Sequence, residues 1–436
     1  MPSPIPNADT QPPTARTTAR RRRRAPELLA PAGDAAALTA ALKAGCDAAY
    51  VGAKSFSMRG AAGNFTLSAL RRAADQCHSR QARLYVAVNT IVYDGEQRAM
   101  LRLLDRLAGV ADAVICWDPA VIAGCRERGI PIHISTQASV ASTAAARFYR
   151  DLGAERVVLA RECTLADVRA IGRRAGIGVE VFAHGAMCVS ISGRCFLSQL
   201  SEGSSGNRGL CRQTCRRPFR VICQDGPADF EVFPGDSHVF SARDLCTLPF
   251  LDQLLEARPV SLKIEGRNRP ADYVDTVIRA YREAIDAWTR GQLDDDLKRD
   301  LAERCRRVFN RQFSDGFYFG RPIADFTPVQ NSAATEKRSY LGRILNYYAR
   351  SGIALAALHN GPLRDGDTAV IIGPTTGSVR LQAQGVRLEE THDGHRTALT
   401  ATFAVPERVR AGDALYLVRP AAPPTTPTTT PPPTQP

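Results

Sequence analysis

Four cysteines lie close together near the middle of the chain, and they are the residues best able to organise chemistry. Cys188, Cys195, Cys211 and Cys215 follow the pattern C-x6-C-x15-C-x3-C within 28 residues. Four thiolates can hold a structural zinc ion or an iron–sulfur cluster. Zinc sites usually contain two close cysteine pairs, whereas the loops around iron–sulfur clusters tolerate irregular spacing. The spacing therefore favours a cluster modestly and leaves zinc open.

Charged side chains accompany the cysteines. The surrounding segment carries four arginines that can offset thiolate charge and contact an anionic substrate: Arg194, Arg212, Arg216 and Arg217. His184 lies four residues before the first cysteine. A lone histidine is more often a hydrogen-bonded structural residue than a catalytic one, but this position makes His184 a candidate for proton transfer.

A second charged segment, Lys263-Ile264-Glu265-Gly266-Arg267, ends an apolar run later in the chain. A guanidinium group binds carboxylate or phosphate through two parallel hydrogen bonds, so Arg267 suits an anionic ligand. A salt-bridged strand end is the structural alternative. Together with His184, we take Glu265 and Arg267 as the candidate catalytic residues.

Motifs of other enzyme classes are missing from the sequence. It contains no G-x-S-x-G elbow, no H-E-x-x-H zinc helix, no P-loop and no dinucleotide fingerprint. His184 and Cys188 are too close in sequence to form a recognisable nucleophile and base pair. These observations disfavour the common hydrolase and nucleotide-binding classes.

The elements that must position these residues follow a regular alternation. Short apolar runs alternate with amphipathic helical segments, which is typical of buried parallel strands joined by crossover helices. The eight runs are Glu27–Ala30, Ala48–Val51, Leu84–Asn89, Ala113–Trp117, Ile132–Ser135, Val157–Ala160, Val179–Ala183 and Val260–Ile264. Eight such units predict an α/β fold of the TIM-like (β/α)8 barrel type, with a doubly wound sheet as the alternative.

The alternation is interrupted after the seventh run, where nearly 80 residues precede the eighth. This insertion, residues 184–259, carries the four cysteines. In such barrels the loops after the strands build the active site. Polar residues just past the predicted strand ends are therefore site candidates: Arg59, Asn64, Asn89, Gln137, Arg161, His184, Glu265 and Arg267.

The remaining sequence suggests further divisions of the chain. Helices are predicted at Ala271–Ala287 and Asp294–Phe309, so the barrel covers residues 27–325. Residues 335–420 contain short strands broken by turns, which predicts a small β-barrel domain. The Arg-rich residues 1–26 and the Pro/Thr-rich residues 421–436 are expected to be disordered tails.

Composition limits the function classes. No stretch approaches the roughly 18 apolar residues of a membrane span, and the Arg-rich start lacks an apolar signal segment, so we expect a cytoplasmic protein. In a reducing compartment clustered thiols indicate metal or redox chemistry rather than disulfides. The net charge is +13, of which residues 1–26 supply five units, and the remaining +8 mildly favours a polyanionic partner such as nucleic acid.

Several dispersed motifs resemble the peptidase U-thirty-two (collagenase-like) family. The signature around the cysteines matches Glu180-Val-Phe182, Gly185-Ala-Met-Cys188, Gly193-Arg-Cys195 and Ser198. Further matches are ELLAPAGD, AGCDAAYVGAKSFSMRGAAGNF, VNTIV, STQASV, SARDLCTLPFL and SLKIEGRNR. The resemblance covers about residues 27–318 and extends more weakly through the C-terminal β-domain.

The resemblance implies a function. The family name comes from reported collagenase activity, but better-understood relatives act in oxygen-independent hydroxylation of a tRNA wobble uridine, a 23S rRNA cytidine or the ubiquinone ring. In several of them four cysteines hold a 4Fe–4S cluster, and the RNA-modifying relatives are linked to prephenate as an oxygen source. Cys188, Cys195, Cys211 and Cys215 match the RNA-hydroxylating branch, with Cys246 as the alternative fourth ligand.

Length, the terminal β-domain and basic charge favour the tRNA branch, so the resemblance implies synthesis of 5-hydroxyuridine in tRNA with a 4Fe–4S cluster and prephenate as a co-substrate. Three alternatives remain. They are a peptidase, an rRNA or ubiquinone hydroxylation factor, and a nucleic-acid-binding module whose cysteines hold zinc.

Overall fold

The computed structural model describes residues 24–60, 62–223, 230–232, 238–322, 325–329, 331–393 and 396–422. The predicted tails therefore lie outside the described residues, apart from 24–26 and 421–422. No helix in the described ranges is both long and apolar enough to cross a membrane.

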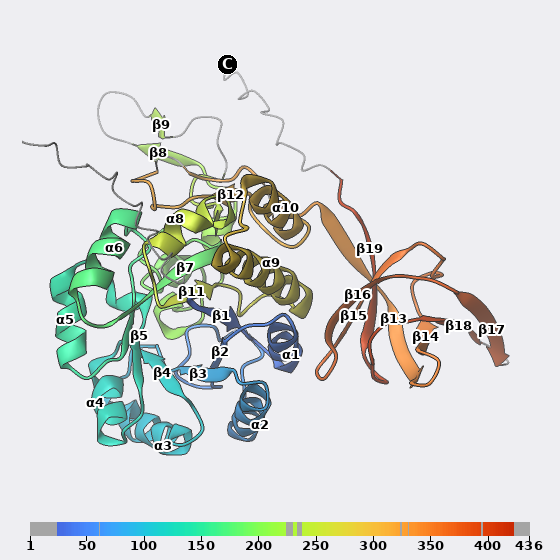
Figure 1. The fold of residues 1–436 in the computed structure, drawn as a ribbon, viewed down its shortest axis with the longest axis horizontal. Helices are drawn as coiled ribbons and strands as arrows, with labels where there is room; N and C mark the ends of the chain where they lie inside the picture. The colour runs from blue at the N-terminus through green and yellow to red at the C-terminus, as the bar shows by residue number, and fades with distance from the viewer. Residues whose placement is uncertain are drawn as a thin grey trace, which may run out of the picture.

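Eight parallel strands form a closed barrel, which confirms the predicted fold class (Figure 1). Their order is β11-β1-β2-β3-β4-β5-β6-β7, and β11 also pairs with β7, so the sheet closes on itself. The strands are β1 (Glu27–Pro31), β2 (Ala48–Gly52), β3 (Arg83–Ala87), β4 (Ala113–Cys116), β5 (Ile132–Ile134), β6 (Arg156–Val158), β7 (Gly178–Ala186) and β11 (Ser261–Ile264). Each contains one of the eight predicted runs or overlaps it.

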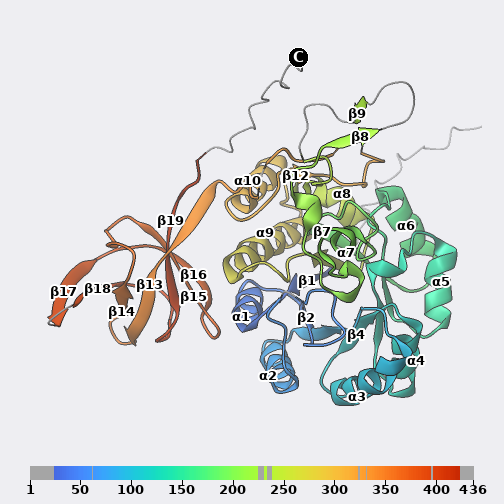
Figure 2. The same cartoon turned by 180° about the vertical axis from the view of Figure 1, so that it is seen from behind.

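Helices surround the barrel and cover its apolar outer face (Figures 1 and 2). They are α1 (Ala35–Lys43), α2 (Leu67–His78), α3 (Gln97–Leu107), α4 (Pro119–Glu127), α5 (Thr143–Asp151), α6 (Leu165–Arg174), α8 (Leu251–Glu256), α9 (Ala271–Arg290) and α10 (Asp295–Arg306). Several begin with an N-cap side chain that accepts a backbone hydrogen bond: Asp34, Thr66, Asp118, Ser142, Thr164 and Asp294. The main hydrophobic core lies between this layer of helices and the strands.

The insertion after β7 is confirmed, and it adds irregular structure to the barrel. It contains α7 (Leu197–Glu202), the short 3-10 helices η3 (Gly206–Arg208) and η4 (Thr214–Arg216), and a hairpin of β8 (Val221–Cys223) and β9 (Phe230–Val232). It returns through β10 (Asp244–Cys246), which pairs antiparallel with the end of β7 and also with β12 (Phe313–Ser314). Two more short helices, η1 (Asp94–Glu96) and η2 (Thr136–Ala138), follow β3 and β5, and η5 (Leu248–Phe250) leads into α8.

The expected C-terminal β-domain is present as a seven-stranded antiparallel sheet of order β16-β15-β19-β13-β14-β18-β17. Its strands are β13 (Glu336–Tyr348), β14 (Ile353–Leu358), β15 (Thr368–Gly373), β16 (Gly377–Gln382), β17 (Arg387–Asp393), β18 (Arg396–Ala404) and β19 (Ala414–Pro420). Within the described residues the two end strands, β16 and β17, do not pair with each other. The domain has its own apolar core.

The β-domain docks on one side of the barrel, against α1 and α9 (Figure 1). The Thr39 hydroxyl donates to the Pro374 carbonyl at 2.7 Å, and Lys43 pairs with Glu407 at 2.8 Å. Arg338 and Asp272 form a third link at 2.7 Å. These contacts fix the domain to the helical layer rather than to the carboxyl ends of the barrel strands.

Candidate active site at the barrel mouth

The four clustered cysteines line one pocket of about 860 Å³. Cys188 and Cys211 are exposed, and Cys195 and Cys215 are partly buried. Burial raises the pKa of the Cys215 thiol, as do the charges of the other three thiols, while Arg216 opposes the shift. The tertiary fold therefore brings all four thiols within electrostatic range of one another.

Hydrogen bonds within the insertion and to a neighbouring loop hold the thiols in place. Asn207 accepts a hydrogen bond from the Cys195 backbone at 2.9 Å. Arg208 reaches the loop after β3, where it pairs with Glu96 and donates to the Ile91 carbonyl. Gly209 has φ +86°, and a Cβ there would lie 2.4 Å from the Ser57 carbonyl, so only glycine allows this approach.

Cys246, the alternative fourth ligand, lies elsewhere. It is in β10, is 2% exposed and does not line the cysteine pocket. Burial raises the pKa of its thiol to about 11. Of the five candidate ligands, the fold brings four into one pocket: Cys188, Cys195, Cys211 and Cys215.

The donors of the cysteine pocket are four thiols, which suit zinc or an iron–sulfur cluster. A zinc ion needs four sulfur atoms about 2.3 Å from a single point. In the described part of the chain no three His, Cys, Asp or Glu side chains converge closely enough to hold one metal ion. The four thiols line a cavity, and so do the guanidinium groups of the buried Arg311 and the half-buried Arg216 and Arg269. Four thiolates around such a cavity, with cations beside them, fit an anionic iron–sulfur cluster.

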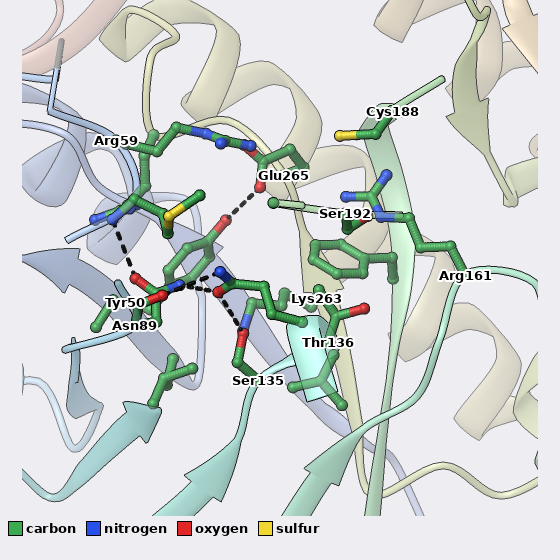
Figure 3. A pocket seen from close by; sticks show the side chains of 18 residues that line it. Tyr50, Arg59, Asn89, Ser135, Thr136, Arg161, Cys188, Ser192, Lys263 and Glu265 are labelled. Carbon is green, nitrogen blue, oxygen red and sulfur yellow. Dashed lines mark hydrogen bonds and ion pairs between the residues drawn. The ribbon is translucent and has the colours of Figure 1, made fainter. Parts of the chain in front are cut away.

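A second pocket, of about 600 Å³, occupies the mouth of the barrel at the carboxyl ends of the strands (Figure 3). Four cationic side chains and one carboxylate line it, namely Arg59, Arg161, Lys263, Arg267 and Glu265. Their formal charges sum to +3, four positive less one negative. The pocket is therefore suited to a small ligand with more than one negative charge.

Glu265 is the centre of the charged wall. It pairs with Arg59 at 3.1 Å and accepts a hydrogen bond from the Tyr50 hydroxyl at 3.3 Å. Burial opposes its ionisation, but the charges of Arg59, Arg161 and Arg267 outweigh burial and lower its pKa to about 2. Glu265 is thus a carboxylate at neutral pH, so it serves as an acceptor or counterion rather than as an acid.

Arg267 lies deeper, with 4% of its surface exposed. It donates to the Ser57 hydroxyl at 2.7 Å, and Gly52 leaves the room that its guanidinium group occupies, because a Cβ at Gly52 would lie 2.2 Å from the Arg267 Nη1 atom. Burial lowers the pKa of Arg267 to about 10, so it remains a cation at neutral pH. A buried guanidinium group with free donors gains most from a carboxylate or phosphate partner.

Lys263 is held from below by a buried ion network. Its ammonium group pairs at 2.8 Å with Glu180, which also pairs at 2.9 Å with Arg156. Burial opposes the ionisation of Glu180, but Lys263 and Arg156 outweigh it and lower its pKa to about 2. The Lys263 ammonium group also lies 4.6 Å from the centre of the Tyr50 ring. This network fixes a cation at the floor of the pocket.

Neutral polar groups line the opposite side. The Asn89 amide donates to Gln137 at 2.8 Å, and the Ser135 hydroxyl donates to the same Gln137 oxygen at 3.1 Å. The Asn89 oxygen accepts from the Met58 backbone at 3.1 Å. These uncharged donors and acceptors can orient a polar ligand without adding charge.

The two pockets share a wall formed by Met58, Arg59, Cys188 and Glu265. Figure 3 shows Cys188 at one edge of the mouth pocket, on the side where Arg59 and Glu265 lie. A ligand that fills the mouth pocket can therefore contact the side chain of Cys188, one of the four clustered cysteines. The arrangement can place a redox group next to a small anionic substrate.

Most of the polar residues predicted at strand ends meet at this mouth. Six of the eight line the pocket: Arg59, Asn89, Gln137, Arg161, Glu265 and Arg267. The other two do not. Asn64 donates to the Arg59 carbonyl at 2.9 Å and so supports the loop after β2.

His184 is inside β7 and not beyond its end, which differs from the expectation. The register of β7 against β11 shifts at Ala183, so Phe182 pairs with Lys263 and His184 pairs with Ile264. This irregularity turns His184 to the outer side of the barrel, because one extra residue reverses the alternation of side chains. His184 lines neither pocket.

The His184 ring packs instead among aromatic side chains. Its centre lies 5.2 Å from Phe313, 5.6 Å from Tyr281 and 6.2 Å from Tyr273. It is 1% exposed, and burial lowers its pKa to about 3, so the ring is neutral. This environment is that of a structural histidine, and the predicted proton-transfer role stays untested.

The four arginines predicted to act beside the cysteines have different positions. Arg216 lines the cysteine pocket and donates to the carbonyls of Met187 and Ala242. Arg194 stacks on Trp117, with its guanidinium carbon 4.5 Å from the ring centre. Arg212 and Arg217 are exposed, and Arg217 pairs with Glu202 at 3.2 Å.

Several residues that line the mouth pocket were not predicted from the sequence: Tyr50, Ser135, Thr136, Phe182 and Ser192. Tyr50 and Phe182 fall within apolar runs, where a strand interior gives no signal of function. The one available signal was the alternation of side chains, since both residues occupy positions that face the barrel interior.

The chain matches one family model and is similar to several known proteins. The family model described as Peptidase family U32 matches residues 33–327. The chain is similar to a collagenase of Porphyromonas gingivalis, with 35% identity over 404 residues that cover 89% of this chain and 97% of the relative. It is also similar to tRNA hydroxylation protein P1 of Bacillus subtilis, with 31% identity over 357 residues, or 80% of this chain and 84% of the relative. The 23S rRNA 5-hydroxycytidine C2501 synthase of Escherichia coli is 36% identical over 299 residues, which cover 67% of this chain and 44% of that protein.

Proposed function

Because the chain belongs to peptidase family U32, we propose that it is an RNA-modifying enzyme that hydroxylates a pyrimidine without using O2. Its substrate is tRNA, its product is 5-hydroxyuridine at the wobble position, and its cofactor is a 4Fe–4S cluster. Relatives named for tRNA hydroxylation and rRNA hydroxycytidine synthesis support the reaction class. The observation that carries the proposal is the wall between the two pockets, where Cys188 is shared by the four-thiol cavity and the cationic barrel mouth.

In this proposal Cys188, Cys195, Cys211 and Cys215 hold the cluster, which supplies one-electron redox chemistry when it is bound. The remaining residues of the two pockets bind and orient the substrates. The cations that line the cysteine pocket offset the negative charge of the thiolates.

The mouth pocket receives the oxygen donor, which we propose to be prephenate. Prephenate carries two carboxylates, and Arg161, Lys263 and Arg267 supply fixed positive charge for them. Glu265 is ionised and holds Arg59 in place, and it lies within reach of the Tyr50 hydroxyl. The target base must leave its stack to reach this pocket, and an anticodon loop offers unstacked bases.

A first experiment tests the cofactor. The protein is purified without oxygen, and its visible spectrum, iron and acid-labile sulfide are measured. Iron and sulfide near four atoms each per chain, with a brown colour, are expected for one 4Fe–4S cluster. A colourless, iron-free protein with stoichiometric zinc contradicts the redox proposal and supports a zinc-stabilised binding module.

A second experiment tests the substrate. Nucleosides from the tRNA and rRNA of a deletion strain are analysed by mass spectrometry, with and without a plasmid copy of the gene. Loss of 5-hydroxyuridine derivatives from tRNA, restored by the plasmid, is expected. Loss of a hydroxylated cytidine from 23S rRNA instead assigns the rRNA reaction, and an unchanged profile contradicts RNA hydroxylation.

A peptidase is the second candidate, because the family model and a relative from Porphyromonas gingivalis carry peptidase or collagenase names. The site offers it little support. The described residues that line the two pockets include no histidine, so neither Cys188 nor Ser192 has an imidazole base beside it there. Cleavage of a fluorogenic collagen peptide by the purified protein, lost in Cys188→Ser, would favour the peptidase.

A further inference from the structure

The insertion exposes an unusual amount of apolar surface beside the candidate active site. Thirteen large hydrophobic side chains are exposed in the described residues, and five of them fall within 22 consecutive positions. These five, named here the apolar rim, are Val189, Ile191, Phe196, Leu200 and Leu210. A concentration of exposed apolar side chains is typical of an interaction site, whereas single scattered ones are not.

The apolar rim borders the cysteine pocket directly. Val189 follows Cys188 and also lines the pocket, Phe196 follows Cys195, and Leu210 precedes Cys211. All four thiols line the pocket, whereas Phe196 and Leu210, the neighbours of Cys195 and Cys211, do not line it and are exposed. Phe196 is 66% exposed and Leu210 is 53% exposed. Whatever covers the rim therefore lies over the cysteine pocket and next to the barrel mouth.

An aromatic side chain from another loop extends the rim. Tyr93, in the loop after β3, is 58% exposed. The guanidinium carbon of Arg208 lies 4.7 Å from the centre of the Tyr93 ring, and Arg208 is tied to the same loop through Glu96. Leu210 follows Arg208 by two residues. The loop after β3 and the insertion thus form one continuous edge, and Figure 2 shows α7 on the face of the barrel that this view presents.

The surface that surrounds the rim is basic. Residues 188–223 contain six arginines and one glutamate, which give +5, and Asp94 and Glu96 beside Tyr93 reduce the sum to +3. Arg194 and Arg212 have no carboxylate partner among the described residues, and both are exposed. Such a surface repels a second copy of itself and attracts a polyanion.

We propose that the apolar rim, with Tyr93, is the docking surface for unpaired bases of an RNA loop. This inference rests on the proposed function and names the part of the protein that recognises its substrate. Unpaired bases expose flat faces that stack on Tyr93 and Phe196, whereas a duplex hides these faces in its own stack. Arg194 and Arg212 contact the phosphates of the same loop.

The arrangement also explains how one base reaches the mouth pocket. The bases on either side of the target stack on the rim, which separates them from the target and leaves that base free to enter the mouth. The rim therefore selects loops over helices, while the arginines add affinity for any RNA. For this reason, substitution of the aromatic residues and substitution of the arginines should have different effects on RNA binding.

The test measures binding by fluorescence anisotropy, without oxygen, using the full chain with its cofactor as purified. The probes are a fluorescein-labelled RNA hairpin with a seven-nucleotide loop and a fully paired duplex of the same stem. Phe196→Ala and Tyr93→Ala should each weaken hairpin binding between about fivefold and a hundredfold, the range of one lost base stack, and leave duplex binding within twofold. Tyr93→Phe keeps the ring and should bind the hairpin as the wild type does.

Two controls accompany these variants. Phe148→Ala removes an aromatic side chain of similar exposure, 59%, from α5 and should change neither affinity. Arg212→Gln should weaken binding of hairpin and duplex alike and reduce the salt dependence of both. Because all four residues are exposed, their melting temperatures should match that of the wild type.

Several results would overturn the inference. One is an unchanged hairpin affinity in Phe196→Ala, and another is an equal loss on hairpin and duplex. Light scattering that shows Phe196→Ala breaking an oligomer while hairpin binding persists would assign the rim to contacts between copies. Loss of binding to anionic lipid vesicles with intact hairpin binding would assign it to a membrane surface. If the protein lacks iron but Phe196→Ala still loses the hairpin selectively, the docking surface stands and the proposed redox function falls.

Discussion

Replacing Glu180 with glutamine tests the buried ion network that holds Lys263 under the mouth pocket. Glu180 is fully buried and is the carboxylate shared by Lys263 and Arg156. Arg156 keeps a second partner in Glu27, but Lys263 loses its carboxylate. The variant therefore leaves a buried ammonium group without a counterion, and the expected result is a large loss of stability.

The size of the loss follows from the pKa of Glu180. The network lowers that pKa from 4.5 to about 2. At about 1.36 kcal/mol per tenfold change in the ionisation constant, this lowering corresponds to ~3 kcal/mol of stabilisation of the carboxylate. Breaking a buried ion pair by removing one partner costs about 3–5 kcal/mol, which is consistent with this figure. We expect Glu180→Gln to lose ~3 kcal/mol of unfolding free energy at pH 7.

The pH dependence of the loss has a definite sign. Because the folded-state pKa of Glu180 is lowered, its contribution is fully present above about pH 4.5 and disappears as the pH falls toward 2. The stability difference between wild type and Glu180→Gln should therefore be constant from pH 7 to pH 5 and shrink below pH 4.5.

Urea unfolding followed by tryptophan fluorescence and far-ultraviolet circular dichroism measures both quantities. Glu256→Gln is the matched control, because Glu256 is exposed and should change stability by less than about 0.5 kcal/mol. The double variant Glu180→Gln with Lys263→Met removes the unpaired cation and should lose less than the sum of the two single losses. A loss of unfolding free energy below about 1 kcal/mol at pH 7 would contradict the stabilising role of the ion network. So would a stability difference between wild type and Glu180→Gln that persists unchanged at pH 3.

Three further predictions concern the site. Cys188→Ser should lose more than half of the iron of the anaerobically purified protein, whereas the buried Cys246→Ser should retain it, and the reverse result would make Cys246 the fourth ligand. In steady-state assays, Arg267→Lys should raise the KM for an anionic oxygen donor roughly tenfold to a hundredfold, with a smaller change in kcat, because lysine cannot bind a carboxylate in bidentate fashion. An unchanged KM argues against that contact. His184→Gln should destabilise the protein by roughly 2 kcal/mol without moving the pH profile of activity, because burial holds the pKa of His184 at about 3. The stability that its neutral ring contributes is present above about pH 6.5 and is lost as the pH falls. A shifted pH profile of activity would restore the proton-transfer role.

Much of the site could be predicted because the loops that follow the strands of a (β/α)8 barrel meet at one face of the barrel. Apolar runs and their helical separators locate eight strands, and parallel strands bring their carboxyl ends to one rim. Arg59, Asn89 and Gln137 follow three different strands, yet they meet in the mouth pocket. Proximity to a strand end was enough to select them.

The same reasoning failed for His184 and for the residues inside strands. His184 was expected just past the end of the seventh strand, but β7 continues through it, and the register shift beside Ala183 turns its side chain outward against α9. A shift of this kind depends on how β7 pairs with β11 and leaves no mark in the local sequence. Tyr50 and Phe182 lie inside strands, and their inward-facing side chains line a pocket only because the sheet closes into a barrel.

The barrel, the place of the insertion and the four cysteines could be predicted from periodicity and residue type along the chain. That the four thiols share one pocket, that Cys246 lies apart from them, and that Cys188 joins this pocket to the cationic mouth is apparent only in the folded protein. Local sequence could not predict these features, because the insertion has no periodicity of its own. Its path is set by long-range contacts, such as Arg208 with Glu96 and Gly209 with the loop after β2, that join residues far apart in the sequence.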